Sequence, residues 1–93
     1  MSRKVTTEVV SAFLASRSRT VSNTSTDGST LYLHGNAIAQ RREDGVVWVT
    51  LAGWNTPTTR ERLNGLPGVR VSTKRGQAYL NNLPWDGSWT RVN

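Results

Sequence analysis

The chain of 93 residues contains no cysteine and a single histidine, His34. The lack of cysteine excludes a disulfide framework, a Cys/His zinc site and a cysteine nucleophile. A Ser-His-Asp triad would depend on His34 as its base, and a lone histidine followed by glycine is more typical of a turn. Phosphate-binding glycine loops and helical metalloprotease motifs are also missing. We therefore expect no catalytic residues, no metal site, no cofactor and no enzymatic activity.

Long apolar runs are equally scarce, since no apolar stretch exceeds a few residues. This pattern predicts no membrane-spanning helix and no association with a membrane. The polar residues that follow Met1-Ser2-Arg3-Lys4 are unlike the apolar core of a signal peptide, so we expect an intracellular protein.

Acidic residues are few: six Asp and Glu stand against twelve Lys and Arg, for a formal net charge of +6. Arginine supplies most of the positive charge, and its planar guanidinium binds phosphate and stacks on bases. Such a charge balance favours nucleic acid, or an acidic protein surface, as the partner.

Hydrophobic patterning predicts one α+β domain over residues 1–93, with two helices and a small antiparallel sheet in the order α-β-β-β-α-β-β. Apolar residues at helical spacing predict an N-terminal helix over 4–16. The turn dipeptides Asp27-Gly28 and Asp44-Gly45 predict a three-stranded meander over 20–52, in which 20–26 forms an edge strand or an ordered loop. We expect the second strand to continue through residue 40, broken or bulged at Gly35-Asn36.

A short helix is predicted over 57–64. A hairpin that turns at Arg75-Gly76 and a tryptophan-containing tail follow over 69–92. Two starts fit this helix: a Thr56 cap before Pro57, or a capping box formed by Thr58 and Glu61. Its polar first turn is a candidate phosphate seat or groove-reading element. The structural alternative is that the threonines only cap the helix.

The candidate binding residues are basic or aromatic side chains, with one threonine at the helix start. Core packing is the default for Trp48 and Trp54, although tryptophans also stack bases in single-strand binders. We expect Trp85 and Trp89, in the tail, to be more exposed. The candidates are Arg41, Arg42, Trp54, Thr58, Arg60, Arg62, Arg70, Lys74, Arg75, Trp85 and Trp89. If the basic hairpin tips point the same way, they form one positive face.

Two stretches, LYLHGNAIA at 31–39 and LAGWNTPTTRERLN at 51–64, carry a resemblance to a known group of proteins. Together with YLN at 79–81 and WDGSW at 85–89, they resemble small bacteriophage-encoded proteins of unknown function. The likeness covers roughly residues 29–92 and leaves the first helix outside. It implies a small accessory protein made in the cytoplasm of an infected bacterium, and it carries no assigned chemistry.

Three functions follow from these observations. The first is a non-enzymatic accessory protein that binds DNA or RNA through an arginine-rich face, with phosphate contacts and tryptophan stacking. The alternative is a modulator that binds an acidic surface of a host enzyme or defence complex. The third is a structural component of the virion.

Overall fold

The computed structural model describes residues 4–42 and 45–92. Helices and antiparallel sheets make up these residues, which confirms the α+β class. The helices are α1 (Lys4–Leu14) and α2 (Pro57–Asn64). The strands are β1 (Arg19–Val21), β2 (Thr24–Thr26), β3 (Thr30–Leu33), β4 (Asn36–Arg41), β5 (Val47–Val49), β6 (Val71–Lys74), β7 (Gln77–Leu80), β8 (Leu83–Trp85) and β9 (Thr90–Arg91).

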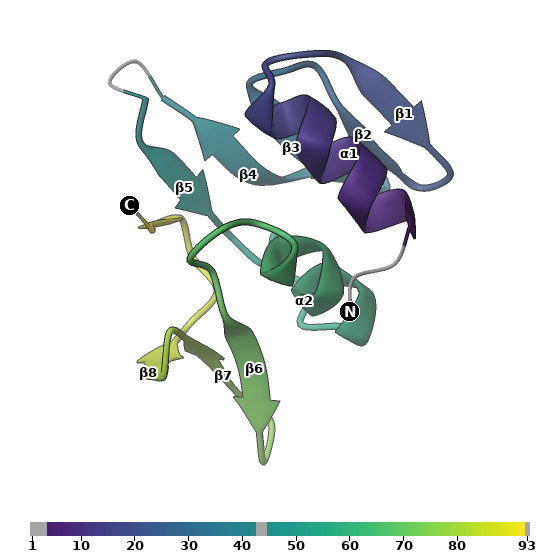
Figure 1. Cartoon of the computed structure of the whole chain (residues 1–93). Helices are drawn as coiled ribbons and strands as arrows, with labels where there is room; N and C mark the ends of the chain where they lie inside the picture. The colour runs from purple at the N-terminus through teal and green to yellow at the C-terminus, as the bar shows by residue number, and fades with distance from the viewer. Residues whose placement is uncertain (1–3, 43–44, 93) are drawn as a thin grey trace.

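The strands form two antiparallel sheets, one in the order β1-β2-β3-β4-β5-β9 and the other in the order β6-β7-β8. The predicted meander is therefore the centre of a larger sheet, because residues 19–26 form a hairpin and the tail returns as β9 beside β5. Figure 1 shows α1 lying across β1 to β3, while β6 to β8 project away beyond α2. The smaller sheet contains the predicted C-terminal hairpin and adds β8 to it.

The prediction of one interrupted strand through residue 40 was wrong, because the chain reverses between β3 and β4. Leu33 pairs with Asn36, and the two residues between them, His34 and Gly35, have φ angles of 52° and 79°. Two successive positive φ angles are typical of a type I′ hairpin turn. The irregularity expected in the strand does occur, but it is a register shift beside Tyr32.

Helix α1 ends two residues before the predicted position because Ser16 adopts a left-handed conformation, with φ 58°. The amides of Ser16 and Arg17 donate to the carbonyls of Phe13 and Ala12, which is the bonding pattern of a Schellman cap. The predicted Asp44-Gly45 turn between β4 and β5 lies partly outside the described residues, since Asp44 is not among them.

Helix α2 begins at the first of its two predicted starts. The Thr56 side chain accepts a hydrogen bond from the Thr59 amide, and Pro57 opens the helix. The core lies between the two helices and the six-stranded sheet, where Phe13, Leu31 and Leu63 are fully buried.

Candidate nucleic-acid interface

The six-stranded sheet has one buried face, here named the inner face. Residues paired across neighbouring strands share a face because side chains alternate along a strand. Thr26 pairs with Leu31, Leu31 with Ala39, and Ala39 with Val49, and all four are buried. Helix α1 contacts β1, β2 and β3 and shares one apolar core with these residues. The inner face therefore packs in the core and stabilises the fold.

The opposite side of the sheet, here named the outer face, is half-exposed. Ser25 pairs with Tyr32, and Gln40 pairs with Trp48, which in turn lies opposite Arg91. The first four of these residues are partly accessible, and Arg91 is exposed. The face thus combines aromatic rings with polar and basic side chains.

Three side chains at one end of the outer face form a cluster, here named the Trp–Arg cluster: Arg42, Trp48 and Trp89. The Arg42 guanidinium lies 4.2 Å from the ring centroid of Trp48 and 5.6 Å from that of Trp89. Its Nε also donates to the Gln40 side chain at 3.3 Å. Arg42 is exposed and Trp89 retains 37% of its surface. Arginine held over a tryptophan ring is a favourable cation–π arrangement, and it fixes the orientation of the guanidinium.

Arg41, the neighbour of Arg42 in sequence, points to the other side of the sheet. One guanidinium nitrogen donates to the Gly28 carbonyl at 2.8 Å, and the other donates to the Phe13 carbonyl at 2.8 Å. The guanidinium also lies 4.8 Å from the Phe13 ring centroid. Arg41 therefore ties the end of α1 to the sheet, and its guanidinium is hydrogen-bonded within the fold.

Arg62 was also predicted to contact a partner, yet its side chain is buried and 3% exposed. Its guanidinium donates to the hydroxyls of Thr24 at 2.8 Å and Thr6 at 3.0 Å, and it forms an ion pair with Glu61. The Asn23 amide oxygen accepts a further hydrogen bond at 3.3 Å. This network joins α1, α2 and β2, so Arg62 does not reach the surface.

The sequence prediction is confirmed for Trp89, which is exposed, but it was wrong for Trp85 and Trp54. Trp85 was expected to be exposed but is buried, and its indole Nε1 donates to the Ser88 carbonyl and the Thr90 hydroxyl. Trp54 was expected in the core but is 59% exposed. Trp48, which was also expected in the core, is partly accessible on the outer face. Alternation in Val47-Trp48-Val49 is the signal that places its ring opposite the buried Val49.

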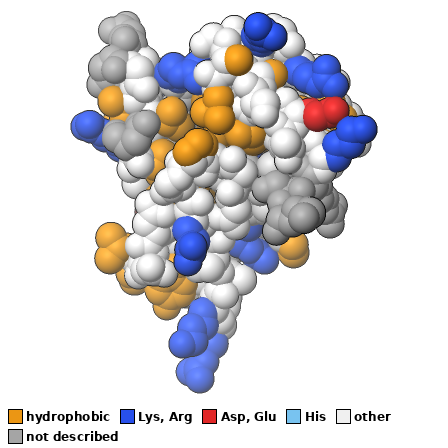
Figure 2. Space-filling view, in the orientation of Figure 1, with side chains coloured by type: hydrophobic (Ala, Val, Ile, Leu, Met, Phe, Trp, Pro, Cys, Tyr) orange, Lys and Arg blue, Asp and Glu red, His pale blue; other side chains and the backbone are white. Residues whose placement is uncertain are grey.

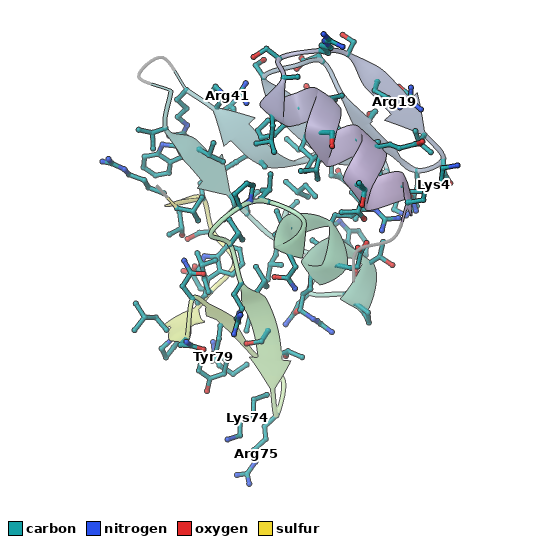
Figure 3. The ribbon with its side chains drawn as sticks, viewed as in Figure 1. Lys4, Arg19, Arg41, Lys74, Arg75 and Tyr79 are labelled. Carbon is teal, nitrogen blue, oxygen red and sulfur yellow. The ribbon has the colours of Figure 1, made fainter. Side chains whose placement is uncertain are left out.

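The other basic candidates do not join the Trp–Arg cluster. Lys74 and Arg75 lie at the tip of the β6–β7 hairpin, at the opposite end of the molecule from Arg41 (Figure 3). Arg70 is exposed, and the Arg60 guanidinium bonds to the Asn55 side chain at 2.5 Å. Figure 2 shows Lys and Arg side chains spread from the upper edge to the lower tip of the face in view. The structure therefore does not gather the predicted basic residues into one positive face.

Two aspartates are used in turns. The backbone amides of Ser29 and Thr30 donate to the Asp27 carboxylate and lower the pKa of that group. The Ser88 hydroxyl and amide do the same for the pKa of Asp86. Within the described ranges, no three His, Asp or Glu side chains come together as metal ligands. Thr58 is half-buried and lines a pocket beside Trp54.

Among the residues described, no helix is long and apolar enough to cross a membrane. No curated protein and no solved structure matches the chain. A family model described as the Kyanoviridae Gp96 protein matches residues 2–91, a span that includes α1, which the sequence resemblance had left out. The chain therefore belongs to the Kyanoviridae Gp96 family of small phage-encoded proteins.

Proposed function

We propose that this phage protein is a non-enzymatic accessory protein that binds single-stranded nucleic acid on the outer face of its six-stranded sheet. The observation that carries the proposal is the Trp–Arg cluster, in which the Arg42 guanidinium lies over the rings of Trp48 and Trp89 on a half-exposed surface. On this proposal the protein acts in the cytoplasm of the infected host.

The cluster supplies the two kinds of contact that a single strand needs. An exposed tryptophan ring stacks on a base, which is worth roughly 1–3 kcal/mol per base and tolerates any sequence. A guanidinium beside it neutralises a phosphate and releases counterions. Tyr32, on the same face, adds a further ring along the sheet. The net charge of +6 favours the approach of a polyanion to this surface.

The experiment is a salt titration of binding to mixed-sequence single-stranded DNA and RNA, with duplex DNA in parallel. Arg42→Gln and Arg75→Gln form a matched pair, since each removes one positive charge. Arg42 directly follows β4 of the six-stranded sheet, whereas Arg75 lies in the turn between β6 and β7 of the smaller sheet. We expect Arg42→Gln to weaken binding about tenfold at about 50 mM salt and to reduce the salt slope by about 0.7, the value for one single-strand phosphate. Arg75→Gln should change affinity by less than about threefold.

An equal effect of the two substitutions would leave only non-specific charge attraction and would contradict the proposal. Failure to bind any polymer at low salt would also contradict it, and would favour the second candidate, a modulator that binds an acidic host protein. One observation favours that candidate: Leu83 is 69% exposed on the small sheet that also carries Lys74 and the Arg75 turn. Exposed apolar surface with basic neighbours suits an acidic protein partner.

A further inference from the structure

A pocket of about 450 Å³ lies where the β3–β4 turn meets the start of α2. Its volume falls in the range of small-molecule sites, roughly 300–1,000 Å³. The lining includes three buried apolar side chains, Leu33, Ile38 and Leu51. The two sequence stretches that carry the phage-protein resemblance, 31–39 and 51–64, thus contribute to one site.

Trp54 also lines this pocket and is more than half exposed. The preceding turn holds it there: Ala52 and Gly53 have φ angles of 53° and 82°, and the Trp54 amide donates to the Leu51 carbonyl. A left-handed alanine costs about 1 kcal/mol or more, and such strain tends to collect at functional sites. The exposed indole offers a flat surface for stacking.

The polar part of the lining has a definite chemical character. The Asn36 amide supplies both a donor and an acceptor, and the Thr58 hydroxyl supplies either. None of the described residues that line the pocket is acidic. The first turn of α2 contributes Thr58 and Thr59 to the lining, and the positive end of the helix dipole lies there. These features suit a flat ring with hydrogen-bonding edges and an anionic substituent.

We infer that this pocket binds the base of a nucleotide, with the ring stacked on Trp54 and its edge hydrogen-bonded to Asn36 and Thr58. The site shares no residue with the Trp–Arg cluster and does not rest on binding there. The nucleotide is either free or an unpaired residue of a longer strand, and both present the same chemistry to the pocket.

The test is an NMR titration of the folded protein with adenosine monophosphate, a short single-stranded oligonucleotide, inorganic phosphate and indole. We expect the nucleotide or the oligonucleotide to shift the resonances of Asn36, Trp54 and Thr58. Trp54→Ala should weaken this binding about tenfold, as loss of one stacking contact does. Because Trp54 is exposed, this variant is expected to stay folded, which its spectrum checks directly. Trp54→Phe should recover part of the affinity. Leu83→Ala, which removes an exposed apolar side chain on the smaller sheet, should leave the pocket response within about twofold.

Each outcome decides the inference. A response to the oligonucleotide alone supports it and identifies a strand as the source, whereas a response to both supports a site open to free nucleotides. Equal shifts with inorganic phosphate would overturn it in favour of a simple anion site. Binding of indole without either nucleotide probe would overturn it in favour of an unselective apolar pocket. If Arg42→Gln leaves oligonucleotide binding unchanged while the resonances of the pocket residues still shift, the result counts against the proposed function and not against this inference.

Discussion

Arg41 and Arg42 are adjacent in the chain, but they have different roles on the two faces of one sheet. The Arg41 guanidinium turns to the inner face and donates to carbonyls of Phe13 and Gly28. The Arg42 guanidinium lies on the outer face against Trp48 and Trp89. Because side chains alternate along a strand, a step of one residue separates a structural arginine from a surface arginine.

The comparison teaches that net charge overstates the charge available to a partner. Arg62 is buried in a network with Glu61, Thr6 and Thr24, and Arg41 is bonded to backbone carbonyls. The formal charge of +6 counts both in full. Stability should depend on the arginines of the inner side, and binding should depend on those of the outer face.

The largest expected effect follows from removing the buried arginine. Arg62→Ala removes the guanidinium that pairs with the Glu61 carboxylate and donates to two buried threonine hydroxyls. Loss of one partner of a buried ion pair costs about 3 kcal/mol or more. Urea unfolding followed by circular dichroism measures the change. Arg60→Ala, on the same helix, is the control and should cost less than about 1 kcal/mol; equal losses for the two variants would contradict the structural role of Arg62.

The second-largest expected effect on stability comes from the adjacent pair, Arg41 and Arg42. Arg41→Ala should lower the free energy of unfolding by about 2 kcal/mol, because two carbonyl groups lose a charged donor. Arg42→Ala should lower it by about 1 kcal/mol at most, the value of an exposed cation–π contact. Denaturant titrations of both variants provide the comparison. An equal loss of unfolding free energy from the two variants would show that Arg41 and Arg42 do not have different roles.

The affinity for a single strand should depend on the outer face and not on the smaller sheet. Trp89→Ala removes the partly exposed ring of the Trp–Arg cluster and should weaken single-strand binding about tenfold, or about 1.4 kcal/mol. Fluorescence anisotropy with a labelled oligonucleotide measures this loss. Leu83→Ala also removes an exposed apolar side chain, but on the smaller sheet, and should leave the affinity unchanged. If the two variants bound alike, the cluster would have no special part in recognition.

The smallest effect concerns pH. Hydrogen bonds from the Ser29 and Thr30 amides lower the pKa of Asp27 in the folded protein below its value of about 3.9 in the unfolded chain. The resulting stability is present above that unfolded pKa and is lost as pH falls through the folded pKa. The stability difference between the native protein and Asp27→Asn should therefore narrow in acid. Thermal melts from about pH 6 to about pH 2, the range in which carboxyl groups titrate, measure this stability difference. A difference that stays constant over this range would contradict the role of Asp27.

Local chemistry is what the sequence predicted well. The α2 start at Thr56 and Pro57 and the hairpin turn at Arg75-Gly76 depend on neighbouring residues only, and both appear where expected. The competing capping box does not form in that way, because Glu61 accepts from the Thr6 hydroxyl and pairs with Arg62. This partner of Glu61 is Thr6 of α1, which is 55 residues away in the chain, so rules based on neighbouring residues do not predict the contact.

Tertiary placement is what the sequence did not contain. Burial of Trp85 depends on the tail returning to the sheet as β9, where the Thr90 hydroxyl accepts from its indole. Exposure of Trp54 depends on the left-handed turn at Ala52-Gly53. The candidate site changed accordingly. Arg41, Arg62 and Trp85 have structural roles, the other basic candidates lie apart from Arg42, and Trp48 joins the site.

The most direct test of the outer-face account is chemical-shift mapping of the native protein with a short single-stranded oligonucleotide. We predict the largest shifts at Tyr32, Gln40, Arg42, Trp48 and Trp89. Shifts concentrated instead at Lys74, Arg75 and Leu83 would contradict the account and would assign binding to the smaller sheet.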